Sequence, residues 1–299
     1  CSVREQSGGR PSRGRFEMIL RAPATTANMG SGFDVVGMAL KLHNTVQFEK
    51  ANRLKVLSIG RYGREIEEAQ QIFGNAIERF EKATGKMVPG VQIIQECNIP
   101  PARGLGSSAA AIASALFIAN IMTGGSIPVR TLLQIGTEIE GHPDNIVPCM
   151  LGGLVVSYYD SERLDYEKFE MTNERLTFLV PEFKLSTDEM RKALPESVPF
   201  RDAVSNLKNV SQFISKIAKG NLTEAFRYTQ DSIHQIYRIN SDPRMKELIS
   251  CIEERHPNFW FVSGSGSSVC CDLEDVEGLP YLEAVIRTSP ANEPFIVGL

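Results

Sequence analysis

Two glycines and two serines stand between a proline pair and an alanine-rich run, in the segment PPARGLGSSAA at residues 100–110. Gly104 and Gly106 let the backbone come close to a bulky anion, because glycine has no Cβ. Ser107 and Ser108 begin an apolar run that is typical of a buried helix. A glycine loop that enters a helix points free N–H groups and the positive end of the helix dipole at one place. The segment therefore predicts a phosphate site, and a serine-capped loop without a ligand is the alternative that it leaves open.

Carboxylates that suit the same chemistry lie in two other segments. Glu138 and Glu140 end a helix predicted over 129–140, and both flank its apolar stripe, so helical geometry does not choose between them as a ligand for Mg²⁺. Asp34 stands between two apolar residues, a setting in which a carboxylate is costly unless it is paired or functional. The plain alternatives are a solvated surface carboxylate for either glutamate and a turn cap for Asp34.

Three familiar nucleotide-binding patterns are missing from the sequence. It contains no Gly-x-x-x-x-Gly-Lys-Ser/Thr, no protein-kinase signature set and no Gly-x-Gly-x-x-Gly after a predicted strand. If the loop at 101–108 binds ATP, it must hold the phosphates without a P-loop lysine. Mg²⁺ must then neutralise the remaining charge.

Composition and charge limit the class of protein. The 299 residues are 42% hydrophobic and 23% charged, which is the composition of a soluble globular protein with a large core. The formal net charge of −4 offers no basic field, so neither nucleic acid nor a membrane is an expected partner. No apolar run reaches the roughly 18 residues that span a bilayer. The six cysteines are scattered without a Cys-x-x-Cys, which favours free thiols in a reducing cytoplasm.

The order of predicted elements is that of a mixed α+β chain. Short apolar runs between turns predict strands of a mainly antiparallel sheet at 18–22, 34–40, 45–48, 54–58, 91–95 and 150–158. Helical patterns predict helices at 65–85, 107–122 and 129–140. Beyond the charged segment 159–175, we expect strands at 176–180 and 259–262, helices at 187–194, 200–219, 222–236 and 243–254, and a final strand, helix and strand.

Two further small-residue segments, in order with the first, resemble the three motifs of the GHMP superfamily of small-molecule kinases. They are PATTANMGSGFD at 23–34 and VSGSGSSV at 262–269. Within the superfamily, EGHPDN at 140–145 and LGG at 151–153 resemble the homoserine kinases. The motifs spread over residues 21–269, so the resemblance covers nearly the whole chain.

The resemblance implies a two-domain fold. An N-terminal domain like domain 2 of ribosomal protein S5 would bind ATP over residues 18–165, and a ferredoxin-like domain would follow over 166–299. Residues 1–17 are rich in Ser, Gly and Arg, and we expect them to be a disordered leader or an expression remnant.

For the nucleotide, the resemblance implies that the glycine loop cradles the triphosphate and that Ser108 and Glu138 hold Mg²⁺. A valine at Gly106 should then meet the phosphate and weaken ATP binding while leaving the fold intact. The expected ATP-binding residues are Pro101, Ala102, Arg103, Gly104, Leu105, Gly106, Ser107, Ser108, Ala109 and Ala110.

For the second substrate, the resemblance implies contacts from five side chains, namely Asn28, Asp34, His142, Arg191 and Arg238. Asn28 and Asp34 would contact a hydroxyl and an amino group, and Asp34 would also orient that hydroxyl or take its proton. The two arginines would bind a carboxylate, because guanidinium groups pair with carboxylates bidentately. Arg238 ends HQIYR, which departs from the family's His-Glu-Pro-Tyr-Arg at Gln235 and Ile236, and Ser267 stands where proline is usual.

Taken with these residues, the resemblance thus implies a cytoplasmic kinase, dependent on ATP and Mg²⁺, that phosphorylates the side-chain hydroxyl of L-homoserine on the way to threonine. The resemblance is compatible with a homodimer. One alternative is a related kinase that acts on mevalonate or a sugar, although the paired arginines argue against a sugar. The other is a non-catalytic metabolite sensor, against which the intact phosphate loop and the acidic candidates argue.

Overall fold

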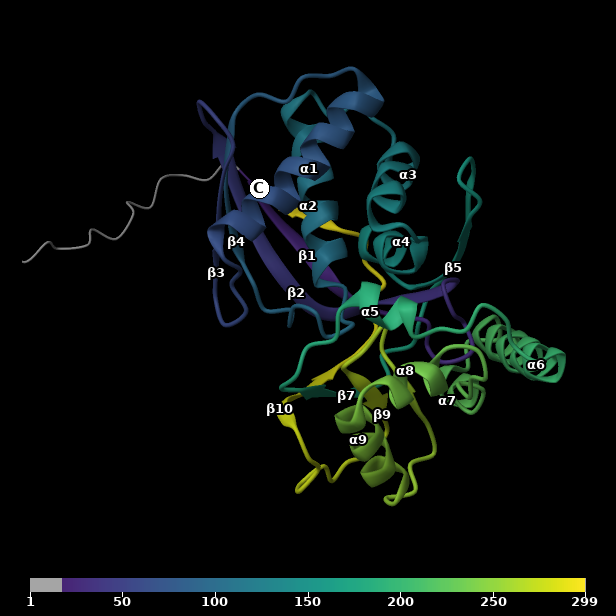
Figure 1. The fold of residues 1–299 in the computed structure, drawn as a ribbon. Helices are drawn as coiled ribbons and strands as arrows, with labels where there is room; N and C mark the ends of the chain where they lie inside the picture. Colours follow the sequence, from purple (N-terminus) through teal and green to yellow (C-terminus); the bar gives the residue numbers. More distant parts are fainter. Residues whose placement is uncertain (1–17, 299) are drawn as a thin grey trace, which may run out of the picture.

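The structure has two sheets, and the first contains strands from both ends of the described chain (Figure 1). It is a computed structural model that describes residues 18–298. The strands of the first sheet are β1 (Met18–Ala27), β2 (Val36–Lys50), β3 (Lys55–Ile59), β4 (Val91–Glu96), β5 (Leu154–Tyr159), β6 (Leu164–Phe169) and β11 (Ile296–Gly298). They follow the order β11-β1-β2-β4-β3, and β5 and β6 extend the sheet from β2. Only the β3–β4 pair is parallel among these strands. The prediction for residues 1–17 lies outside the described residues.

Strand β2 is longer than predicted, because it joins the two strands expected at 34–40 and 45–48. The polar residues between them resemble a turn in the sequence, yet they continue the strand. The side chain of Asn44 explains why, since its Oδ1 accepts the backbone N–H groups of Asn98 and Ile99 at 2.8 and 3.0 Å. These bonds satisfy the oxygen of the buried side chain, whereas its Nδ2 has no partner within the described residues.

Four helices cover one face of this sheet, α1 (Ile66–Thr84), α2 (Ser107–Met122), α3 (Val129–Glu140) and α4 (Pro143–Leu151) (Figure 1). The predicted helices at 65–85, 107–122 and 129–140 are confirmed to within a residue or two. Helix α2 is alanine-rich and buried along most of its length, so it packs among its neighbours rather than against solvent. Helix α4 was not predicted, because Pro148 inside it is a residue that normally ends a helix.

The second sheet has four antiparallel strands in the order β10-β7-β9-β8. They are β7 (Leu176–Pro181), β8 (Trp260–Val262), β9 (Val269–Cys271) and β10 (Leu282–Thr288). The helices of this unit are α5 (Thr187–Lys192), α6 (Phe200–Ile217), α7 (Leu222–Phe226), α8 (Gln235–Ser241) and α9 (Pro243–Glu253). The helix predicted at 222–236 is in fact two short helices, and the helix predicted between the last strands is wrong, because residues 272–281 are irregular.

The two units are joined twice. The boundary expected after residue 165 falls inside β6, so the chain leaves the first sheet only after Phe169. The last strand, β11, then returns to pair with β1. Near the crossing, Asn292 accepts the N–H of Met171 and donates to its carbonyl, both at 2.8 Å. Helix α5 lies at the junction of the units (Figure 1).

Two further expectations concern thiols and membranes. Five cysteines in the described chain carry free thiols, and all but Cys251 are buried. Within residues 18–298, no helix has the length and apolarity that crossing a bilayer requires.

Candidate functional site

Three small-residue segments that are far apart in the sequence meet between the two units. We call residues 101–108 the phosphate loop, residues 28–34 the N-terminal turn and residues 263–268 the second glycine loop. Backbone hydrogen bonds join the two loops to each other and to the end of β1, directly before the N-terminal turn: Ser268 N to Arg103 O at 3.1 Å, Thr25 N to Leu105 O at 3.2 Å, and Gly264 N to Ala27 O at 3.0 Å. A pocket of about 100 Å³ opens where they meet.

The glycines of the phosphate loop make room for protein atoms. Gly104 and Gly106 have positive φ angles of 71° and 69°, which favour glycine. A Cβ on Gly104 would lie 1.9 Å from the carbonyl oxygen of Ser263, and one on Gly106 would lie 1.9 Å from Oγ1 of Thr25. The expectation that a side chain at Gly106 would meet phosphate in an intact fold is therefore wrong, because it would first collide with β1.

Six of the ten residues expected to bind ATP line the pocket, namely Ala102, Gly104, Leu105, Gly106, Ser107 and Ser108. The other four do not. Ala109 and Ala110 are buried in the core, and Pro101 lies outside the lining. Arg103 is turned toward the second unit, where its Nε donates to the carbonyl of Pro181 at 2.7 Å and its Nη2 to that of Glu182 at 2.7 Å. Its side chain anchors the loop and does not face a ligand.

Glu140, and not Glu138, faces the phosphate loop. Ser108 Oγ donates to Oε2 of Glu140 at 3.3 Å, and burial raises the pKa of this carboxyl above its usual value. Glu138 is exposed and accepts from the Tyr159 hydroxyl at 3.3 Å, outside the pocket. Two residues turn an α-helix by about 200°, so only one of the pair can face the loop. The expected magnesium pair, Ser108 with Glu138, does not come together in the structure.

Asp34 and Arg191 form a bidentate ion pair in the pocket. Arg191 donates from Nη1 to Oδ2 at 2.9 Å and from Nη2 to Oδ1 at 2.7 Å. Asp34 has a φ of 58°, and its backbone N–H donates to Oδ1 of Asn28 at 2.9 Å. The Nδ2 of Asn28 donates in turn to the carbonyl of Gly264 at 2.8 Å. Both ends of the Asn28 amide are thus engaged, so this residue fixes the position of Asp34, and it lines the pocket with one further N–H and one further lone pair.

Arg238 and Arg191 both lie against the ring of Phe33. The two Cζ atoms are 5.2 and 5.7 Å from the centre of the Phe33 ring, which attracts both cations through its π face. Arg238 is buried, and its Nη1 donates to the carbonyl of Gly264 at 2.9 Å. Burial, together with the charge of Arg191, lowers its pKa to about 10, against the opposing effect of Asp34. Its buried Nε has no partner within the described chain, so a donor remains available in the site.

A buried neutral histidine holds Arg238 in place. His234 stacks on Phe33 with ring centres 5.0 Å apart. Burial lowers its pKa to about 4, so the ring is neutral near pH 7. Its Nδ1 then accepts from Arg238 Nη1 at 3.3 Å, while Nε2 donates to the carbonyl of Gly30 at 2.8 Å. No sequence pattern marks this role of His234, because it depends on contacts that only the fold creates.

A chain of polar side chains holds His142 at the rim of the pocket. Its Nδ1 lies 2.6 Å from Oδ1 of the buried Asp144, which also accepts from Asn145 at 3.2 Å. Asn145 accepts from the Thr25 hydroxyl at 2.7 Å. Burial alone would lower the pKa of His142, but hydrogen bonding to Asp144 and the charge of that carboxylate raise it above its usual value..

Asp34, His142 and Asp144 also place three ligand atoms within 4.8 Å of one another, as a metal site would require. Hydrogen bonds account for this grouping. Nδ1 of His142 already pairs with Asp144, and both oxygens of Asp34 already pair with Arg191. A cation here would have to displace these bonds, so the geometry favours Glu140 and Ser108 as the place for a hard cation.

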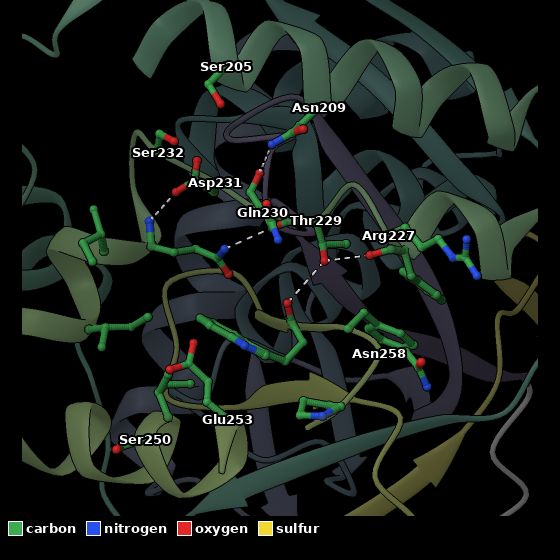
Figure 2. A pocket seen from close by; sticks show the side chains of 18 of the residues that line it. Ser205, Asn209, Arg227, Thr229, Gln230, Asp231, Ser232, Ser250, Glu253 and Asn258 are labelled. Carbon is green, nitrogen blue, oxygen red and sulfur yellow. Dashed lines mark hydrogen bonds between the residues drawn. The ribbon is translucent and has the colours of Figure 1, made fainter. Parts of the chain in front are cut away.

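A larger cavity of about 650 Å³ lies in the second unit, and Figure 2 shows Asn209, Gln230 and Asp231 along its wall. Asp231 accepts the backbone N–H groups of His234 at 2.8 Å and Gln235 at 2.6 Å, so this wall carries the segment that positions Arg238. The cavity contains neither the phosphate loop nor the Asp34–Arg191 pair. The phosphate loop and the Asp34–Arg191 pair therefore both line the smaller pocket.

Comparisons with known proteins agree with this geometry. The model of the GHMP kinases N terminal domain matches residues 71–153. A homoserine kinase of Thermotoga petrophila is 48% identical over 281 residues, which cover 94% of this chain and 99% of that protein. One of Clostridium kluyveri is 35% identical and covers 86% of this chain and 87% of its own.

The fold is also that of a solved structure. The crystal structure of homoserine kinase from Cytophaga hutchinsonii matches with a TM-score of 0.79 at 23% identity, covering 99% of this chain and 100% of that one. The α+β, GHMP-kinase-like fold that the sequence predicts is confirmed, and the structure builds it from two sheets.

Proposed function

The chain belongs to the homoserine kinases, a branch of the GHMP kinases, and from this premise we propose that it transfers the γ-phosphoryl group of ATP to the side-chain hydroxyl of L-homoserine. The observation that carries the proposal is the Asp34–Arg191 ion pair, with Arg238 beside it, in the pocket that contains the phosphate loop. The pair offers both charges that a free amino acid needs.

The substrate is a zwitterion, and we propose that it replaces the existing ion pair with two new ones. Its ammonium group takes the place of Arg191 on Asp34. Its carboxylate takes the place of Asp34 on Arg191 and also receives a hydrogen bond from the unpartnered Nε of Arg238. Charged groups removed from water need such partners, so the exchange keeps every buried charge paired.

His142 completes the substrate end of the pocket. Because its Nδ1 is engaged by Asp144, its Nε2 is the ring nitrogen left to meet the substrate. The raised pKa keeps a larger share of the ring protonated near neutral pH, and the protonated ring donates from Nε2. We assign it the role of a donor to a substrate oxygen.

The phosphate loop and Glu140 suit ATP with Mg²⁺. The first N–H groups of α2 lack helical partners and point into the pocket, which favours phosphate oxygens. Ser108 and Glu140 present two hard oxygens 3.3 Å apart, and burial raises the pKa of the Glu140 carboxyl, an effect that a bound cation would oppose. These are the groups that would hold Mg²⁺. When bound, Mg²⁺ neutralises charge on the transferring phosphate.

In the transfer itself, the substrate hydroxyl oxygen bonds to the γ-phosphorus as the bond to ADP breaks, and the hydroxyl proton passes to Asp34. Phosphoryl transfer has a loose transition state, so positioning and charge neutralisation account for most of the catalysis. Asp34 therefore needs to orient the hydroxyl more than it needs to act as a strong base.

The test is ADP release by the purified protein with ATP, Mg²⁺ and a panel of L-homoserine, L-serine, mevalonate and galactose. We expect kcat/KM to be highest for L-homoserine by at least about a hundredfold, because a site that pairs buried charges rejects substrates that lack them. Equal or faster turnover of mevalonate or galactose would reject the assignment. If homoserine binds by calorimetry but no member of the panel releases ADP, the chain is a metabolite sensor.

A further inference from the structure

The phosphate loop lacks a cation of its own. The loop contains one arginine, Arg103, and its guanidinium donates to the carbonyls of Pro181 and Glu182 in the second unit. Arg191 and Arg238 are committed to the substrate end, where both lie against Phe33. The triphosphate of ATP carries several negative charges, and partial charges on N–H groups balance them only in part.

Arg64 lies next to the phosphate loop, although the segment that contains it carries no sequence motif. Its Nη2 donates to Oγ of Ser107, the first residue of α2, at 3.0 Å. The side chain is only 9% exposed, although it comes from the connection between β3 and α1. A second amino group of the guanidinium pairs with Glu68, which is itself half exposed.

The backbone around Arg64 is fixed against the strand that leads into the phosphate loop. The N–H of Arg64 donates to Oγ of Ser58 at 3.0 Å. The N–H of Cys97, at the end of β4, donates to the carbonyl of Ile59 at 2.8 Å. The backbone of Arg64 is therefore held in register with the loop, and Glu68 pairs only with the end of its side chain.

The guanidinium of Arg64 lies next to the pocket wall. Ser107, which accepts its hydrogen bond, lines the pocket together with Ser108. A cation that contacts the first residue of α2 is close enough to act on phosphates bound at the same serines.

We propose that Arg64 is the cation that binds the triphosphate of ATP on the phosphate loop, in the role that lysine has in P-loop enzymes. This inference rests on the proposed function. Arg64 donates to Ser107, so the hydroxyl proton of Ser107 is free to point at a phosphate oxygen. The guanidinium keeps further N–H groups that can donate to the phosphate itself. Arginine binds phosphate best through two parallel N–H donors. Glu68 holds the side chain in place until the nucleotide arrives.

The experiment compares Arg64→Gln, Arg64→Lys and the control Arg61→Ala. Arg61 is an exposed arginine three residues away whose guanidinium lies 5.2 Å from the Tyr62 ring. Calorimetry at one fixed salt concentration gives Kd for ATP, ADP and adenosine, with and without Mg²⁺. Turnover of L-homoserine gives kcat and the KM for ATP.

We expect Arg64→Gln to weaken ATP binding by roughly ten- to a hundredfold, since a hydrogen bond to a charged group is lost. The loss should be smaller for ADP and absent for adenosine, and Arg64→Lys should recover part of it. Arg61→Ala should bind ATP as the wild type does.

An equal loss for ATP and adenosine would show that Arg64 only supports the fold, and no loss for ATP would remove it from the site. Both results overturn the proposal while wild-type turnover still supports the kinase function. If the wild type itself does not bind ATP, the proposed function fails, and the role of Arg64 fails with it.

Discussion

The two ends of the pocket are built in different ways. The phosphate end is made of backbone, in glycines with positive φ whose missing Cβ atoms leave space for Ser263 and Thr25. The substrate end is made of charged side chains from different segments, and Asp34 and Arg191 already pair with each other. The phosphate end is therefore preorganised, whereas the substrate end must exchange partners before it can bind.

This difference assigns a separate task to each end. A preorganised backbone binds phosphate regardless of what the phosphate is attached to, so it gives affinity without choosing the second substrate. A bidentate ion pair gives way most readily to a molecule that offers a hydrogen-bond partner to both charges, because otherwise one of the two is left without its partner. In the proposed function, selectivity for a zwitterion follows from the pairing of Asp34 with Arg191.

The largest effect is expected at the boundary between the two ends. Glu140→Gln keeps the size of the side chain and removes the charge beside Ser108, so it should lower kcat by at least about a hundredfold and raise the Mg²⁺ concentration needed for half-maximal rate. Glu138→Gln is the matched control on the same helix, and its kcat should stay close to that of the wild type. Steady-state kinetics over a Mg²⁺ series decide this. A large loss in Glu138→Gln with none in Glu140→Gln would reverse the assignment.

A smaller effect is expected at the substrate end alone. Arg191→Ala removes one partner of a charged hydrogen-bonded pair, a loss of about 2–5 kcal/mol. The KM for L-homoserine should therefore rise at least tenfold, while calorimetric affinity for ATP stays the same. Lys192→Ala, at the exposed neighbour on α5, should leave both values unchanged. If ATP affinity falls in parallel with homoserine affinity, the two ends are not independent.

At the phosphate end, the glycines should matter for folding. Gly106→Ala should lower the free energy of unfolding by about 1–3 kcal/mol, since it adds strain at positive φ and a collision with Thr25. Gly85 is a matched control, because its φ is also 69° and no atom lies within 4 Å of its would-be Cβ. Gly85→Ala should cost only about 1–2 kcal/mol. Urea unfolding measures the free energy of unfolding of both variants. Equal losses would show that the collision with Thr25 does not lower stability.

The smallest effect concerns pH. The folded protein keeps His234 neutral down to about pH 4, whereas the unfolded chain takes up a proton on this residue near pH 6.5. The unfolded state then binds more protons, so the contribution of His234 to stability is present above pH 6.5 and is lost as the pH falls toward 4. His234→Gln should flatten the fall in unfolding free energy across this range. His256→Gln, at an exposed histidine, should keep the wild-type slope. Parallel slopes in His234→Gln and the wild type would contradict the buried neutral ring.

Features that have a local sequence pattern could be predicted from the sequence, whereas features that depend on the fold could not. The phosphate loop and helix α2 could be predicted, because glycines with positive φ and an alanine-rich run leave a local pattern. The choice between Glu138 and Glu140 could not, since it depends on how α3 is rotated against the loop. Arg64 lies 43 residues before Ser107 and carries no motif, so only the fold brings the two together. The sequence predicts two strands in place of β2, because Asn44 is hydrogen-bonded to residues that are far away in the sequence.

The central claim is that the substrate end reads both charges of a zwitterion by exchanging the Asp34–Arg191 pair. Its most direct test is kcat/KM of the wild type and Arg191→Ala for L-homoserine and for the amino alcohol that lacks its carboxylate. The account predicts a loss of at least about tenfold in the wild type when the carboxylate is removed, a similar loss for L-homoserine in Arg191→Ala, and little further loss when both changes are combined. If the wild type phosphorylates the amino alcohol as well as it does L-homoserine, or if the two losses simply multiply, Arg191 does not bind the carboxylate and the account is wrong.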